Sequence, residues 1–161
     1  MKLIKHMLML TMATGGLVAC NDNDDDIYIP PAAFTDHVSI SANSWEPFEN
    51  GGVYGYLTEF EVPDLTENIH DNGAVLVYLD FGEGLFDALP QVYNDVSILY
   101  NTFPYSLEIQ MVGINNIEID PPSGEILCKI VLIEGAALKA HPEVDLKKMT
   151  LKEVERTFNV Q

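Results

Sequence analysis

The first candidates for chemistry in this 161-residue chain are acidic side chains that lie close together in the sequence. Glu83 and Asp87 are four residues apart, and a glycosidase uses two carboxyl groups that flank the bond it cuts. Because the chain holds 25 acidic residues, however, pairs of this kind also arise by chance. We therefore expect no catalytic residue and predict that the chain is not an enzyme, with a hydrolase of surface polysaccharide as the alternative.

The histidines lack the spacing of a metal site. His37, His70 and His141 are far apart and form neither an HxH nor an HExxH motif, so a zinc site is not expected. The sequence also has no GxSxG, no glycine-rich phosphate loop and no CxxC. We therefore predict no metal and no cofactor.

Several aromatic residues are of the type that stacks on sugar rings. Trp45, Tyr54, Tyr56 and Tyr78 have this capacity, but they occur in or beside segments with strand-like spacing. Aromatic side chains at that spacing are more typical of a hydrophobic core. We expect these four residues to lie mainly in the core.

The amino-terminal segment has the organisation of an export signal. Lys2 and Lys5 precede a mostly apolar run from Met7 to Ala19. As a helix this run would span only ~20 Å, whereas the hydrocarbon core of a membrane is ~30 Å thick. A basic start, a short apolar middle and small residues at the end indicate a signal peptide over residues 1–19 rather than a permanent membrane helix.

Cys20 has the most specific chemical context in the chain. The preceding residues Leu17, Val18 and Ala19 complete a segment that resembles the lipobox of bacterial lipoprotein signal peptides. The resemblance implies that the Cys20 thiol receives a diacylglyceryl group, that a peptidase cuts after Ala19, and that the freed amine is acylated. Several acyl chains on one residue make a stable membrane anchor. The alternative is a buried or disulfide-linked cysteine within a longer apolar helix.

A highly acidic segment follows the predicted cleavage site. Residues 21–26 read Asn-Asp-Asn-Asp-Asp-Asp, and we interpret residues 20–33 as a self-repelling tether. The segment resembles the acidic stretch of surface-exposed lipoproteins of the Bacteroidetes type. Asn21 stands where an Asp would signal inner-membrane retention, so the resemblance implies an exposed position at the outer membrane. A calcium loop is the alternative, although the glycine and glutamate of an EF-hand are missing.

Charge is unevenly distributed along the predicted mature chain. Removal of residues 1–19 takes away Lys2 and Lys5 and leaves six bases against 25 acids, a formal charge of −19. From residue 21 to residue 128 there are 20 acids and no Lys or Arg. Such a surface repels nucleic acid, so we predict no nucleic-acid partner. It fits a solubilised extracellular face, or alternatively a surface for cations or a basic partner.

The remaining chain has the pattern of a strand-rich domain over residues 34–161. Short apolar or alternating segments are separated by Gly, Pro and Asn clusters, and alternation of this kind is typical of half-buried strands. The predicted strands are Phe34–Ile40, Val53–Glu61, Ala74–Leu79, Val96–Tyr100, Tyr105–Met111, Ile117–Ile119 and Ile126–Ile133. We expect Ala74–Leu79 to be a central strand buried on both faces. About seven strands without helical periodicity predict an all-β fold, a single antiparallel β-sandwich.

One helix is predicted at the carboxyl end. Thr150 and Glu153 match a capping box, and Leu151, Val154 and Phe158 form one apolar stripe that can pack on the sandwich. The cysteine that remains after lipidation, Cys128, lies in a continuous apolar run and is expected to be a buried apolar residue.

Parts of the domain resemble a small β-sandwich of unknown function found in many Bacteroidetes lipoproteins. The resemblance rests on four segments: Asp71–Tyr78, Ala88–Pro90, Cys128–Ile133, and Val144 to Val154. One departure is Leu85-Phe86, where a tryptophan is expected. The family implies a fold and an outer-membrane location but no reaction. We therefore predict a lipid-anchored module that binds or scaffolds a protein or glycan and exposes an aromatic or apolar patch. A calcium-stiffened stalk is a further alternative.

Overall fold

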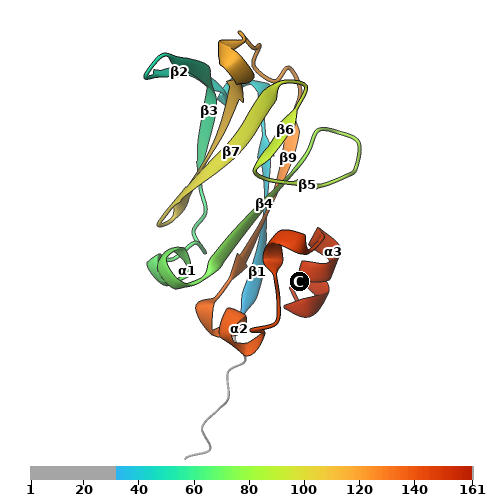
Figure 1. Cartoon of the computed structure of the whole chain (residues 1–161). Coiled ribbons are helices and arrows are strands. Elements are labelled where there is room, and N and C mark those ends of the chain that lie inside the picture. The colour runs from blue at the N-terminus through green and yellow to red at the C-terminus, as the bar shows by residue number, and fades with distance from the viewer. Residues whose placement is uncertain (1–31, 161) are drawn as a thin grey trace, which may run out of the picture.

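The computed structural model of the protein describes residues 32–160, in which two antiparallel sheets pack face to face (Figure 1). The first sheet has four strands in the order β1-β9-β4-β5. Their bounds are β1 Ala33–Ile40, β4 Ala74–Asp80, β5 Asp87–Ala88 and β9 Ile126–Ile133. This arrangement places β4 and β9 in the interior of the sheet, where continuous apolar runs are expected.

The second sheet has five strands in the order β2-β3-β8-β7-β6. Their bounds are β2 Glu46–Asn50, β3 Val53–Glu61, β6 Gln91–Tyr93, β7 Val96–Phe103 and β8 Ser106–Gly113. The short strands β2 and β6 form the two edges. Pro47 in β2 is compatible with this position, since an edge strand can leave one row of its backbone groups without ladder bonds.

The main core lies between the sheets. Alternate residues of β9 and β4 face alternate residues of β7 and β8, and the most buried members are Val77, Leu79, Ile98, Leu107, Ile109, Ile130 and Leu132. One polar link crosses this core. The Tyr100 hydroxyl of β7 donates a hydrogen bond of 2.9 Å to the backbone oxygen of Val75 in β4. The strand β5 pairs only with Tyr78 and Leu79 of β4, so the Tyr100 hydroxyl supplies a donor to the Val75 oxygen at a position that β5 does not reach.

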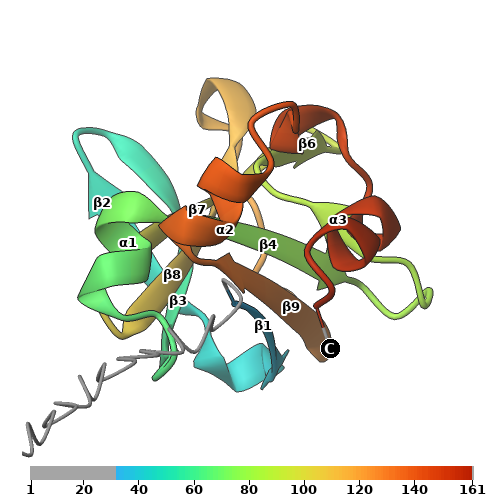
Figure 2. The same ribbon diagram turned by 90° about the horizontal axis from the view of Figure 1, so that it is seen from below.

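A helical layer covers the other face of the first sheet, as seen from below in Figure 2. It consists of α2 (Gly135–Ala140), the 3₁₀ turn η3 (Leu146–Lys148) and α3 (Leu151–Thr157). Val154 and Phe158 pack against Tyr78, Val131 and Ile133 in a second apolar cluster. Lys129 of β9 forms an ion pair with Glu155 of α3. The strands β4 and β9 are therefore covered on both faces.

The structure confirms the predicted fold class, an antiparallel β-sandwich with a short carboxyl-terminal helix. It also confirms the capping box of that helix. Thr150 N–H donates to the Glu153 carboxylate at 2.8 Å, and Glu153 N–H donates to Thr150 Oγ1 at 3.4 Å. The strands β3 and β9 have the predicted bounds, because their patterns are long and uninterrupted.

The prediction of a strand at Ile117–Ile119 was wrong. After β8 the chain forms the 3₁₀ turn η2 (Ile114–Asn116) and doubles back, so that a Cβ on Gly113 would lie 1.9 Å from the backbone oxygen of Ile117. Ile119 packs against the main core from a loop, without a partner strand. Tyr105 was also misplaced, since it occupies the β7–β8 turn with φ of 68°.

Three strands and two helices were not predicted. The strands β5 and β6 have only two and three residues, and β2 contains a proline. The helices α1 (Glu67–Asn72) and α2 have six residues each, too few to reveal a helical period in the sequence. The described domain therefore has nine strands, rather than about seven.

The two-sided burial of β9 predicts a position-dependent loss of stability within one strand. Ile130 is 0% exposed, whereas Leu127 in the same strand is 43% exposed. We expect Ile130→Ala to lower the free energy of unfolding by ~2–5 kcal/mol, because it removes buried methyl groups and leaves a cavity. The matched control Leu127→Ala should cost less than ~1 kcal/mol. Urea unfolding measures both values, and equal losses would contradict the assignment of the core.

Candidate functional site

A cleft lies between the loop after β4 and the β6–β7 hairpin. Its volume is about 390 Å³, and its floor is formed by Ile98 and Met111 from the main core. Its walls combine apolar and acidic side chains, namely Phe81, Glu83, Leu85, Asp87, Tyr93 and Asp120. We call this the acidic cleft. The described residues that line it include no Lys, Arg or His.

A buried carboxylate shapes one wall of the acidic cleft. Asp80 ends β4 and is almost completely buried. Its Oδ1 accepts hydrogen bonds from the backbone N–H groups of Gly82, Glu83 and Gly84 at 2.8, 2.9 and 3.0 Å. Gly82 and Gly84 have φ values of 99° and 75°, which side chains rarely tolerate. Asp80 therefore holds the loop in place.

This loop presents apolar side chains to solvent. Leu85 is 66% exposed and Phe81 is 44% exposed, and across the cleft Tyr93 is 66% exposed. Exposed apolar groups beside the carboxylates of Glu83 and Asp87 can contact both the apolar and the polar parts of a ligand. The predicted exposed apolar patch is therefore present at this cleft.

Sequence reasoning identified only part of the acidic cleft. The structure brings Glu83 and Asp87 to the same cavity, and both side chains are exposed. Sequence reasoning missed Phe81, Leu85 and Tyr93. Phe81 and Leu85 lie within the Gly-containing segment 81–85, and apolar residues in such a turn are an unusual composition that could have marked these two out. Asp120 comes from a loop distant in sequence, and no local pattern connects it to the others.

A second hollow, of about 450 Å³, lies beside the β2–β3 hairpin. It is lined by Pro47, Phe48, Tyr54, Tyr56, Ile117, Glu118 and Ile119, and we call it the hairpin groove. Tyr54 is 61% exposed here, which corrects its expected place in the core, whereas Tyr56 is half-buried. Trp45 and Tyr78 are buried as expected.

The structure keeps the three candidate histidines on separate elements. His37 is in β1, His70 is in α1 and His141 follows α2. Within residues 32–160, no group of three or more His, Cys, Asp or Glu side chains has an arrangement that could hold a metal ion. Cys128 is buried in β9 as predicted, and burial together with the negative charge of Asp36 raises the pKa of its thiol to about 12. Its thiol is therefore protonated and shielded at neutral pH.

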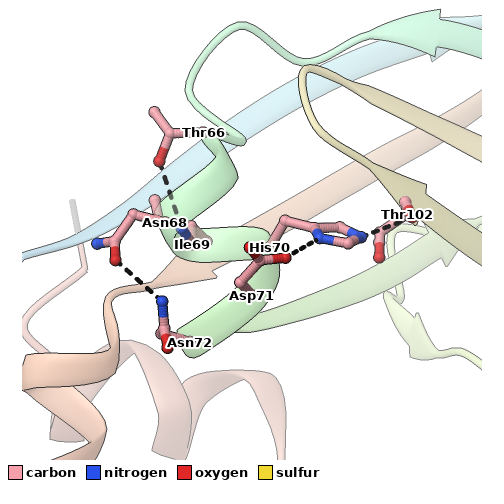
Figure 3. A network of polar contacts seen from close by, with 7 residues as sticks. All are labelled: Thr66, Asn68, Ile69, His70, Asp71, Asn72 and Thr102. Atoms are coloured by element: carbon pink, nitrogen blue, oxygen red, sulfur yellow. Dashed lines mark hydrogen bonds and ion pairs between the residues drawn. The ribbon is translucent and has the colours of Figure 1, made fainter.

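His70 connects α1 to β7 through its ring (Figure 3). With both ring nitrogens protonated, Nδ1–H donates to Asp71 Oδ1 at 2.8 Å and Nε2–H donates to the backbone oxygen of Thr102 at 3.1 Å. The bond to Asp71 and the weaker effect of Thr102 raise the pKa of His70 above its usual value of 6.5. Thr66 caps the helix, because its Oγ1 accepts a bond of 3.3 Å from Ile69 N–H.

The predicted lipidation site lies outside the part of the chain that the structure describes. Cys20, the preceding Leu17, Val18 and Ala19, and the acidic stretch 21–26 lie outside the described residues. Within residues 32–160, no helix is long and apolar enough to span a membrane. In the comparisons with known proteins, no family model, curated protein or solved structure matches the chain.

The contacts of His70 predict a pH dependence. A pKa above 6.5 in the folded state means that the protonated ring stabilises the fold below pH 6.5, and that this stabilisation is lost as the pH rises through the folded pKa. NMR titration of the ring should give a value above 6.5, which Asp71→Asn should lower. Glu59→Gln, which removes an acid from a different element, is the control and should leave the titration of His70 unchanged.

Proposed function

We propose that this chain is an outer-membrane lipoprotein, held by acyl chains on Cys20 and exposed at the cell surface. We propose further that its β-sandwich is a non-catalytic module that binds a protein or a glycan. The lipobox-like segment and the acidic stretch after it support the anchor. The acidic cleft, in which exposed apolar side chains lie beside carboxylates, is the observation that carries the binding role.

The strand register supports this use of the cleft. Ala33, where the chain enters the first sheet, pairs with Ile133 of β9, whereas Asp80 at the cleft pairs with Leu127. Six residues of strand separate these two levels, a distance of ~20 Å at ~3.3 Å per residue. An anchor attached through β1 would therefore hold the cleft away from the membrane, ~20 Å farther along the sheet. Figure 1 shows the two strands, β1 and β4, on which this estimate rests.

The length of the preceding segment is compatible with surface display. Residues 20–32 reach at most ~45 Å when fully extended. The four Asp residues within them are repelled by an anionic membrane surface. The domain would then stand clear of the headgroups while its cleft faces outward.

The exposure of the cleft carboxylates favours binding over catalysis. A glycosidase needs one acid that is shielded from water, so that it can donate a proton, beside a second acid at a fixed separation. Glu83 and Asp87 are both exposed. Their presence in one cleft is nevertheless the specific observation that favours a polysaccharide hydrolase as the second candidate function.

The anchor predicts metabolic labelling at one cysteine. Cells that express the full chain and are fed labelled palmitate should incorporate the label, because Cys20 would be acylated. Cys20→Ser should abolish the label, whereas Cys128→Ser should retain it, since Cys128 is buried in the folded domain. An unlabelled full chain would overturn the lipoprotein assignment and would leave the binding role of the cleft to be judged separately.

The cleft predicts a loss of binding without a loss of stability. Glycan and peptide arrays probed with the full chain should give signals that fall at least ~5-fold in Leu85→Ala and Tyr93→Ala, because exposed apolar anchors contribute most of the affinity at such sites. Phe103→Ala removes an exposed ring outside the cleft and serves as the control. Turnover of a polysaccharide that disappears in Glu83→Gln or Asp87→Asn would instead establish the hydrolase.

A further inference from the structure

The acidic cleft and the hairpin groove share one wall. The loop from η2 to β9 places Ile117, Glu118 and Ile119 in the hairpin groove, and the next residues along it, Asp120 and Pro122, line the acidic cleft. Consecutive parts of one loop therefore line both hollows.

Both hollows combine apolar surface with uncompensated negative charge. The hairpin groove offers Tyr54, Phe48 and Glu118, and the acidic cleft offers Tyr93, Leu85 and three exposed acids. The 16 acids between residues 32 and 128 have no Lys or Arg among them. The described bases, which begin at Lys129, lie on β9, α2, η3 and α3.

The sheet topology sets the length of a ligand that fills both hollows. The hairpin groove is lined from β2 and β3 and the acidic cleft from β6, β7 and β8, so the two hollows together extend across the five-stranded sheet from β2 to β6. Four spacings between neighbouring strands, at ~4.8 Å each, give ~19 Å. An extended peptide covers this distance with about six residues.

We infer that the two hollows form one bipartite surface for an extended, basic segment of a partner protein. This inference rests on the proposed binding role of the acidic cleft and names its ligand class. Lys and Arg side chains suit both hollows, because their aliphatic stems pack on Leu85 or Tyr54 while their charged ends reach Glu83, Asp87, Asp120 or Glu118. The exposed rings of Tyr93 and Tyr54 add cation–π contacts.

The negative charge of the two hollows favours a basic peptide over an anionic polysaccharide or a neutral sugar. An anionic polysaccharide would meet only like charges in either hollow, and repulsion of this kind lowers both affinity and association rate. A neutral sugar would stack on the tyrosine rings but would gain nothing from the surplus of carboxylates. A basic peptide uses both features, and its binding must weaken as salt screens the charges.

The experiment measures binding of labelled peptides by fluorescence anisotropy to the full lipidated chain in nonionic detergent. The probes are a ten-residue peptide that alternates lysine with tyrosine or serine, the same peptide with glutamate in place of lysine, and a four-residue version of the lysine peptide. Three double variants are compared: Glu83→Gln with Asp87→Asn in the cleft, Tyr54→Ala with Glu118→Gln in the groove, and Glu59→Gln with Glu61→Gln as control. The control removes two exposed charges from β3 outside both hollows.

We expect the ten-residue lysine peptide to lose ~4- to 25-fold in affinity in the cleft variant, at ~2- to 5-fold for each of its two charges. It should lose at least ~4-fold in the groove variant, at ~2-fold or more for the Glu118 charge and ~2-fold or more for the Tyr54 ring. The control should stay within ~2-fold, because it removes two charges, as the cleft variant does, but at positions outside both hollows. The four-residue peptide should respond to only one of the two hollow variants, and the glutamate peptide should not bind. Affinity should fall as sodium chloride is raised.

Two results would overturn the inference while leaving the proposed function intact. If the groove variant leaves the affinity of the ten-residue peptide unchanged, the cleft acts alone. If a neutral hexasaccharide binds at the cleft and the lysine peptides do not, the ligand is a glycan. If no probe responds to the cleft variant, both the inference and the proposed binding role fail.

Discussion

The burial of β4 and β9 on both faces is the constraint on which the rest of this structure depends. In β9, Ile130 faces the second sheet and Val131 faces the helices, and both are completely buried. A strand that is apolar on both sides needs cover on both sides, because each uncovered face would leave apolar surface in water. The five-stranded sheet supplies one cover, and α2, η3 and α3 supply the other. The molecule is therefore a sandwich with a third, helical layer.

The same constraint determines how polar groups at the buried strands are satisfied. Lys129 is the one charged residue of β9, and it reaches Glu155 of α3 while its ammonium group lies 5.8 Å from the centre of the Phe86 ring. Asp80 ends β4 in a buried position and takes its donors from the backbone of the next residues. That local solution forces a tight, glycine-containing loop, and the loop forms a wall of the acidic cleft. A requirement of the core thus shapes the surface that we propose as a binding site.

The layers also separate the charges. The Lys and Arg residues of the described chain are confined to β9 and the helical part that follows it, whereas the described sheets and loops before β9 carry acids and no Lys or Arg. Opposite charges pair at the helical layer: Lys129 of β9 contacts Glu155 of α3, and Lys148 contacts Asp145. The cleft and the groove have no such partners among their lining residues. Their negative charge is therefore available to a ligand rather than being used within the fold.

Local sequence patterns are enough to predict the fold class, the central strands and the terminal helix. Long apolar or alternating runs such as Ile126–Ile133, and the Thr150–Glu153 capping box, are local signals that do not depend on distant residues. The motif at Cys20 is equally local, and it stays a prediction because it lies outside the described residues. Three features depend on long-range packing instead: Ile119 packs on the core from a loop, Tyr54 is exposed, and Glu83, Tyr93 and Asp120 line one cleft. The physical reason is that a strand needs a partner and a cleft needs walls, and here the partners and walls come from segments far apart along the chain.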